Sequence, residues 1–336
     1  MPPLTRGARR HARRGLTLVE VLIALAIAGI VSTILLMTLT SQQRMYATLD
    51  TRTRVQRNLR TGVSLLPADL RSASVTGGTS TAGGGDLVAL QDTMIQLRAT
   101  IGSSVVCGIP GVSPSRRQID LPPLNASANV FSTWYTQPVP GDTVWVYDEN
   151  VKPTPDDDRW TPYTIASFQQ APVAAGSPVC PAAAFLDSSK DAQSAAKPRY
   201  RVTLSDTLAD SVRVGAGVRF TRQVRYSLFV PAAAAAAKPP RAYLGYAEQV
   251  AGAWGTPDVL AGPFRAYAMG GGGGLAFSYF DSTGASIAAP VSVGDRLRVA
   301  RVDVRLRSVM QPPRTVDTLR AVRDSALFRI ALRNRQ

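Results

Sequence analysis

Residues 16–39 read LTLVEVLIALAIAGIVSTILLMTL, a stretch of 24 residues with a single charged side chain, Glu20. As an α-helix this stretch would be about 36 Å long, at about 1.5 Å per residue. That length is enough to cross a hydrocarbon core of about 30 Å with some tilt. The sequence therefore predicts one membrane-spanning helix close to the N-terminus.

The segment before this helix, residues 1–15, reads MPPLTRGARRHARRG and holds five arginines and no acidic residue. Basic residues that flank a first apolar helix keep that end of the chain in the cytoplasm. We therefore expect a basic leader peptide and a single-pass inner-membrane protein, with a cytoplasmic N-terminus and a periplasmic C-terminal domain.

Two residues at the start of the span depart from an ordinary secretory signal. Such a signal has its small residue after the apolar stretch, whereas Gly15 precedes it. An unpaired carboxylate such as that of Glu20 costs about 2.5 to 3.5 kcal/mol inside a membrane helix. Cleavage between Gly15 and Leu16 would create an α-amino group that a neighbouring subunit could offer to Glu20. The lone carboxylate therefore predicts a role in assembly.

The hexapeptide GLTLVE at residues 15–20, followed by about twenty apolar residues, resembles the type IV prepilin signal. This resemblance implies that prepilin peptidase cuts after Gly15 and methylates the new N-terminus at Leu16. It also implies that Glu20 pairs with a terminal amine during filament assembly. Most members of the family have Phe or Met at the first mature position, so Leu16 is a departure that bears on methylation. The alternative is a plain signal anchor in which Glu20 has no such role.

Residues 40–72 continue with apolar side chains at three- or four-residue steps from Met45 to Leu70, which predicts an amphipathic extension of the helix. Pro67 is expected to kink this extension or to end one helix and start a short second one. The same pattern resembles the long N-terminal helix of pilins.

From residue 73 to residue 336 the composition changes to Gly, Ser, Thr and Pro with short apolar stretches, which is typical of β-structure. The fold class we predict is α+β, with a β-rich, mainly antiparallel extracytoplasmic domain and an insertion at residues 110–197. A bulge near Val299 and Ala300 would reconcile two out-of-phase halves of one strand, and DSTGAS at 281–286 predicts a hairpin turn. The predicted strands are 87–90, 94–99, 143–147, 163–168, 200–204, 218–230, 242–249, 275–280, 296–309 and 326–332.

The C-terminal passages LAFSYFDSTGASI at 275–287, RVARVDVRLRSV at 298–309 and LFRIALRNR at 327–335 resemble the closing sheet of large minor pilins and pseudopilins of the PilW and GspJ types. This second resemblance implies a minor subunit rather than a major pilin.

Several chemistries are disfavoured by composition. The one histidine, His11, lies in the predicted leader, so Ser-His-Asp and Cys-His nucleophiles and His-containing zinc sites are excluded from the mature chain. We therefore expect no enzyme activity and no cofactor. Asp156, Asp157 and Asp158 could offer oxygens to calcium, but consecutive side chains of an extended chain point in different directions, which favours a solvated acidic loop.

The two cysteines, Cys107 and Cys180, would lie in an oxidising compartment, where we expect them to form a disulfide. Closing a loop of about 74 residues in this way would stabilise the fold by about 2 to 4 kcal/mol.

The 38 basic residues exceed the 23 acidic ones, giving a net charge of +15. Removal of the five leader arginines leaves 33 minus 23, or +10. Arginines at alternating strand positions favour solvated sheet faces, although such a surface would also attract the phosphates of DNA or of lipid head groups.

Together these features predict a minor pilin or pseudopilin, a processed structural subunit of a type IV pilus or of a type II secretion pseudopilus. The expected partners are prepilin peptidase, other pilin subunits, an inner-membrane assembly platform and the lipid bilayer. A DNA-binding competence pseudopilin is one alternative. A signal-anchored periplasmic β-domain or enzyme is another, and an enzyme would need a carboxylate pair that the sequence does not mark out.

Overall fold

The structure is a computed structural model, and the chain separates into two units, residues 1–53 with 311–322 and residues 54–310 with 323–336. The residues that the structure describes are 17–61, 64, 66–73, 85–111, 116–124, 132–149, 158–171, 199–235, 241–265, 273–310 and 322–332.

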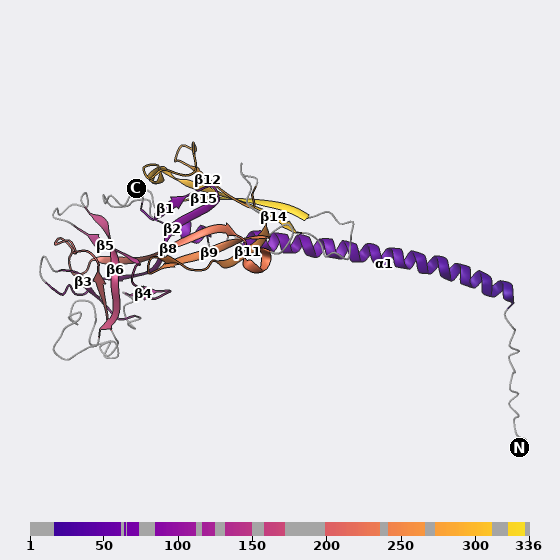
Figure 1. The fold of residues 1–336 in the computed structure, drawn as a ribbon, viewed down its shortest axis with the longest axis horizontal. Coiled ribbons are helices and arrows are strands. Elements are labelled where there is room, and N and C mark those ends of the chain that lie inside the picture. Colours follow the sequence, from indigo (N-terminus) through magenta and orange to yellow (C-terminus); the bar gives the residue numbers. More distant parts are fainter. Residues whose placement is uncertain are drawn as a thin grey trace, which may run out of the picture. The chain divides into compact units, whose positions relative to one another are not determined.

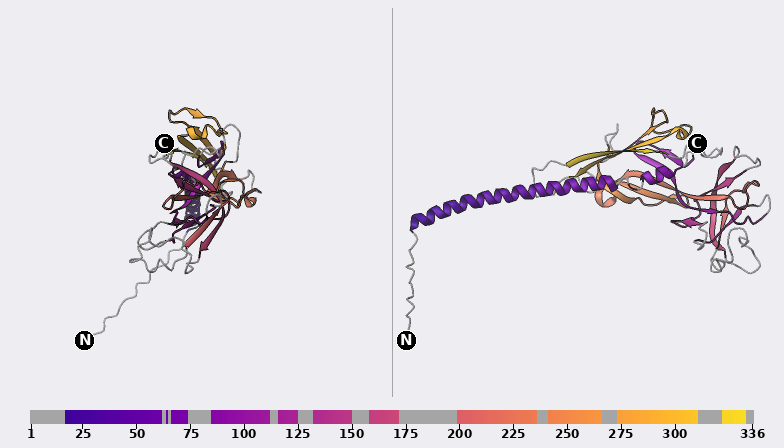
Figure 2. Two further views of the ribbon diagram at one scale, coloured as in Figure 1. Left: turned by 90° about the vertical axis from the view of Figure 1, so that its left-hand side faces the viewer. Right: turned by 180° about the vertical axis from the view of Figure 1, so that it is seen from behind.

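Two helices open the described chain. Helix α1 (Leu18–Thr61) is uninterrupted over 44 residues, and its last turns, from Arg54, belong to the second unit (Figures 1 and 2). Helix α2 (Leu66–Ser72) has Pro67 at its second position, where a missing backbone N–H costs nothing because the first turn has no internal acceptor for it. The second helix that Pro67 predicts is therefore confirmed.

The rest of the described chain is β-rich, and every strand pairing whose register is described is antiparallel. The predicted α+β fold class is confirmed. The short helical elements are α4 (Ala232–Ala235) and the 3₁₀ turn η3 (Arg296–Arg298). The strands are β1 (Leu87–Leu90), β2 (Met94–Val105), β3 (Gln118–Leu121), β4 (Thr133–Trp134), β5 (Thr143–Asp148), β6 (Arg159–Ala171), β7 (Arg199–Leu204), β8 (Gly217–Phe229), β9 (Ala242–Val250), β10 (Ala253–Trp254), β11 (Asp258–Phe264), β12 (Leu275–Phe280), β13 (Ser286–Ile287), β14 (Arg301–Met310) and β15 (Val322–Ala331).

Strand β8 organises the sheet because its two edges are used differently. One edge pairs with β2 from Gly217 to Ser227. The other edge pairs with β5 at residues 218–221 and with β9 at residues 224–229. The sheet therefore forks at β8, with the order β13-β12-β14-β11-β9 on one side and β5-β6-β7-β3 on the other. In Figure 1, β3, β5 and β6 lie towards one end of β8, and β9 and β11 towards the other.

The strands β3, β5, β6 and β7, which we call the β5–β7 lobe, share a hydrophobic core with β4 and with parts of β2 and β8. The predicted insertion at residues 110–197 includes β3 to β6, and these strands are part of the sheet around β8. Trp134, Phe168 and Tyr200 pack edge to face or stacked, with ring centroids 4.8–5.5 Å apart. The buried core residues include Ile119, Leu121, Val144, Val146, Ile165, Val202, Leu204, Val218 and Phe220.

The structure corrects the predicted start of β14 and adds strands that the sequence did not predict, among them β3, β4, β10 and β11. The segment predicted as one strand from Arg296 instead begins with η3, and β14 starts only at Arg301. Ser292 and Asp295 explain this, because the Ser292 hydroxyl accepts from Asp295 N–H and donates to its carboxylate, and such local bonds favour a turn over a strand. No bulge is therefore needed at Val299. The unpredicted strand β11 carries a proline, which usually argues against a strand.

The hairpin turn predicted at residues 281–286 is confirmed. Asp281 Oδ1 accepts hydrogen bonds from Thr283 N–H and Ala285 N–H, both at 2.9 Å. Gly284 has φ of 88°, a conformation that glycine adopts without strain. The turn joins β12 to β13, which pair at Tyr279 and Phe280.

Cys107 is fully buried after β2 and is disulfide-bonded in the structure. Its N–H donates to the carbonyl of Asp120 at 2.9 Å. Cys180, the second of the two cysteines, lies outside the described residues, so the bridge between Cys107 and Cys180 stays a prediction.

The predicted bridge can be tested by denaturation. Reduction of the protein, or the double change Cys107→Ser and Cys180→Ser, is expected to lower the free energy of unfolding by about 2 to 4 kcal/mol, because the unfolded chain loses a constraint. Urea unfolding with and without a reductant measures the loss, and the double variant serves as a control that the reductant should not affect. A wild-type transition insensitive to reduction would contradict the prediction.

Candidate assembly site

Helix α1 begins immediately after Thr17, which caps it. The carbonyl of Thr17 accepts hydrogen bonds from the N–H groups of Glu20 and Val21, at 3.1 and 3.2 Å. The Thr17 hydroxyl oxygen accepts a further bond from Glu20 N–H at 3.3 Å. The spacing Thr-x-x-Glu is that of a capping box, so Glu20 occupies the third position of the helix.

The carboxylate of Glu20 lies in the first turn of α1, where the helix dipole favours a negative charge. The side chain is exposed. Along the described part of α1 the first basic side chain is Arg44, 24 positions further on. The described turns of α1 next to Glu20 therefore offer it no cation.

The helix that follows Glu20 is suited to lipid. Its most apolar window of 18 residues has a mean hydropathy of 2.6, and α1 is the one helix in the described chain that is long and apolar enough to cross a membrane. The hydroxyls of Thr33 and Thr38 donate to the carbonyls of Gly29 and Ile34, each at 2.8 Å. These hydroxyls are satisfied within the helix, as an environment without water requires.

The last turns of α1 and helix α2 pack against the β-domain. Of the stripe predicted from Met45 to Leu70, residues Leu59, Leu66 and Leu70 are buried, together with Val55, whereas Met45 is exposed. Buried apolar side chains on both helices therefore fix the base of the N-terminal helix on the sheet.

A polar contact adds to this attachment. The hydroxyl of Tyr226, on β8, donates a hydrogen bond of 2.5 Å to Asp69 on α2. Burial raises the pKa of Tyr226 far above its usual range, so the phenol keeps the proton that it donates. Burial also raises the pKa of Asp69, although the hydrogen bond from Tyr226 acts in the opposite direction.

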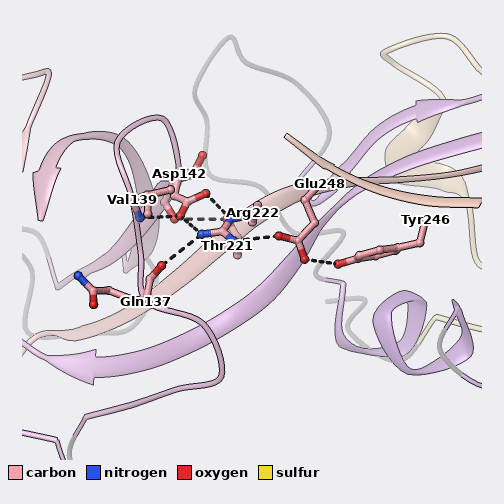
Figure 3. Close-up of polar contacts among 8 residues, drawn as sticks. Gln137, Val139, Asp142, Thr221, Arg222, Tyr246 and Glu248 are labelled. Atoms are coloured by element: carbon pink, nitrogen blue, oxygen red, sulfur yellow. Dashed lines mark hydrogen bonds and ion pairs between the residues drawn. The ribbon is translucent and has the colours of Figure 1, made fainter. Parts of the chain in front are cut away.

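Arg222 lies where β8 passes from β5 to β9, and it joins both (Figure 3). Its Nε and Nη2 donate to the two carboxylate oxygens of Asp142, at 3.0 and 2.9 Å. Its Nη1 donates to Glu248 on β9 at 2.9 Å. The side chains of Arg222 and Asp142 are 4% and 1% exposed, so this pair is almost fully desolvated. The hydrogen bonds from Arg222 to Asp142 are the main cause that raises the pKa of Arg222.

The same network continues to the base of the helix. Tyr246 donates to the second oxygen of Glu248 at 2.9 Å, and its ring lies 5.3 Å from that of Tyr226. The contacts therefore run from Asp69 on α2 across β8 and β9 to Asp142 at the start of β5. Nothing in the sequence analysis anticipated this network.

The other predicted site residues are placed as follows. Gly15, Leu16 and Cys180 lie outside the described residues, and so do Asp156 and Asp157. Asp158 accepts a hydrogen bond from the Tyr147 hydroxyl at 2.6 Å. Among the described residues no three His, Cys, Asp or Glu side chains form a group that could hold a metal ion.

Comparison with known proteins identifies the N-terminal segment. Residues 10–36 match the family model described as the prokaryotic N-terminal methylation motif. Together with the long apolar helix, this match fits a type IV prepilin-like protein. The motif implies processing by prepilin peptidase and assembly with other pilins, and the helix is compatible with a single-pass inner-membrane anchor. No curated protein and no solved structure matched the chain.

Proposed function

We propose that this protein is a minor pilin or pseudopilin of the PilW or GspJ type, which is built into a type IV pilus or a type II secretion pseudopilus as a tip or initiation subunit. The observation that carries the proposal is the methylation motif on an exposed apolar helix, with Glu20 in the capped first turn. The role is structural, without catalysis and without a cofactor.

The mechanism of assembly follows from the chemistry of the helix. The leader stays cytoplasmic and the β-domain is periplasmic. Hydrolysis after Gly15 frees the α-amino group of Leu16, which prepilin peptidase then methylates with a methyl donor. The inner-membrane assembly platform then draws α1 out of the bilayer into a bundle of like helices. Glu20 is neutralised there by the terminal amine of a neighbouring subunit, because an unpaired carboxylate is costly in an apolar bundle.

The β-domain supports a specialised position in the filament. The β5–β7 lobe packs around a core that it shares with β2 and β8, and its strand β5 pairs with β8 next to β9. Each copy of a repeating major subunit must accommodate neighbours on all sides of its domain. An added lobe is easier to accommodate at a filament end, where fewer neighbours pack.

One alternative has an observation in its favour. Arg98, Arg219 and Arg296 form a cluster in the β-domain with one carboxylate among its described residues, and arginines in excess of carboxylates attract phosphate. A DNA-binding competence pseudopilin would bind an oligonucleotide with strong salt dependence. Binding that is absent at low salt would remove this alternative.

The proposal predicts the N-terminus of the mature protein. Intact mass and N-terminal sequencing of the membrane protein are expected to give a chain that begins with N-methyl-Leu16, because prepilin peptidase cleaves after Gly15. The Gly15→Glu variant and a peptidase-deficient strain are expected to keep the full leader. A chain that starts at Met1 in the wild type, or that is cut beyond Leu39, would leave a signal-anchored or secreted periplasmic β-domain or enzyme.

A further inference from the structure

Two arginines lie against a tryptophan on the sheet where β2, β8 and β5 run side by side. Trp145 on β5 lies directly opposite Arg219 on β8. The guanidinium carbon of Arg219 is 5.5 Å from the Trp145 ring centroid, and that of Arg98, on β2, is 5.9 Å away. The indole is buried and its N–H donates to the Thr221 hydroxyl at 3.1 Å, so the ring is held in one orientation.

The carboxylate at this cluster is that of Asp86, which is fully buried. Arg219 binds it with both terminal nitrogens, at 3.0 and 3.2 Å. Arg98 instead donates through Nη1 to the carbonyl of Gly85 at 2.6 Å. This acceptor is neutral, so the bond does not offset the positive charge of Arg98. The bidentate geometry therefore assigns Asp86 chiefly to Arg219.

A third guanidinium, that of Arg296, comes from the 3₁₀ turn η3. The segment before η3 is docked on β1, because Val291 N–H donates to the carbonyl of Leu90 at 2.9 Å. Burial lowers the pKa of Arg98; the Asp86 charge opposes this, and the nearby charges of Arg296 and Arg219 add to the lowering. Burial likewise lowers the pKa of Arg296.

The cluster also holds donors without acceptors. The Nε atoms of Arg98 and Arg296 are buried, and neither has a hydrogen-bond partner among the described residues. Among the described residues, three guanidinium groups and one carboxylate thus belong to this cluster, which leaves an excess of two positive charges there. Buried donors that belong to charged groups are costly to leave unpaired.

We propose that Arg98, Arg219 and Arg296 bind a phosphate group, either free or as a phosphate monoester. A phosphate dianion carries the two negative charges that the cluster lacks, and its oxygens can accept from the unpaired guanidinium donors. Arginine suits this role because its planar fork matches phosphate geometry. The site is independent of the membrane helix, so it goes beyond the proposed role in assembly.

The test uses inorganic phosphate and the mature full-length protein in detergent at constant ionic strength. Binding is read by calorimetry and by the change in tryptophan fluorescence, since the Trp145 ring lies 5.9 and 5.5 Å from the guanidinium carbons of Arg98 and Arg219. Arg296→Gln is expected to weaken binding at least tenfold. Because the side chain of Arg296 has no hydrogen bond or ion pair with the described residues, this variant should not lower the melting temperature.

Arg298→Gln is the matched control, because Arg298 lies in the same 3₁₀ turn and its side chain is 61% exposed and paired with Asp281 and Asp295. It makes the same change of charge and is expected to leave phosphate binding unaltered. Equal weakening by the two variants would overturn the site in favour of general surface attraction, and so would the absence of wild-type binding at millimolar phosphate.

Two further ligands identify the source of the phosphate and test the charge argument. Glycerol 3-phosphate, a dianionic monoester, is expected to bind at least as well as inorganic phosphate if the natural ligand is a monoester, and more weakly if it is free phosphate. Dimethyl phosphate carries one negative charge and should bind at least tenfold more weakly than inorganic phosphate. Equal binding of dimethyl phosphate and inorganic phosphate would overturn the proposal that the two excess positive charges of the cluster select a dianion.

Discussion

Replacing Arg222 with methionine should lower the free energy of unfolding of the β-domain by about 3 to 5 kcal/mol. The substitution removes the guanidinium and keeps a flexible apolar side chain in place of the aliphatic stem of Arg222. Asp142, whose side chain is 1% exposed, would then be left as a buried charge with one described donor, Val139 N–H at 2.9 Å. Glu248 is 37% exposed and can turn to water, so the loss falls mainly on Asp142.

Urea unfolding of the mature protein at neutral pH measures this loss, with Arg298→Met as the matched control. Arg298 also contacts two carboxylates, but its side chain is 61% exposed, so its removal is expected to cost about 0 to 1 kcal/mol. Adding Asp142→Asn to Arg222→Met removes the buried charge and should recover part of the loss. A loss below about 1 kcal/mol for Arg222→Met would contradict the view that the pair holds the fork together.

The position of Arg222 shows what the sequence could and could not predict. Residues 218, 220, 224 and 226 of β8 are buried and alternate with more exposed ones, and Arg222 falls in the buried series. A charged residue in an inward series indicates a buried partner. The partners, Asp142 and Glu248, lie 80 and 26 positions away, so they cannot be identified before the strand order is known. Arg98, Arg219 and Arg296 likewise come from distant segments, so their proximity cannot be predicted before the strand order is known.

Patterns within short stretches of sequence predicted the elements of the fold better than they predicted contacts between distant residues. The bounds of β1 and β12 match the predicted 87–90 and 275–280, because short apolar stretches there are bounded by turn residues. Strand β11 was missed because Pro263 argues against a strand. The turn η3 was missed because Ser292 and Asp295 form side-chain hydrogen bonds that the alternation of apolar and polar residues does not reveal. The fork at β8 depends on contacts between distant segments, and no local pattern encodes it.

Replacing Glu20 with glutamine should reduce incorporation of the protein into filaments at least tenfold, while cleavage after Gly15 and insertion in the membrane continue. The carboxylate in the span costs about 2.5 to 3.5 kcal/mol, so its removal should favour the membrane-inserted form. It also removes the partner of the terminal amine in the filament, which then enters an apolar bundle unpaired. Both effects act against extraction from the bilayer. Immunoblots of sheared filaments against the membrane fraction measure the ratio, and wild-type incorporation of the Glu20→Gln variant would contradict the assembly role of Glu20.

The hydrogen bonds at the start of α1 make this test specific to the charge. Thr17 caps the helix through the backbone N–H of Glu20, and the substitution leaves that N–H in place. Glutamine also keeps the length of the side chain and is an acceptable third residue of a capping box. A loss of assembly in Glu20→Gln would therefore come from the lost charge and not from a frayed helix.

Glu20→Asp keeps the charge on a shorter side chain and should retain more incorporation than glutamine. If aspartate and glutamine were equally defective, side-chain length rather than charge would decide assembly, and the pairing with a terminal amine would be wrong.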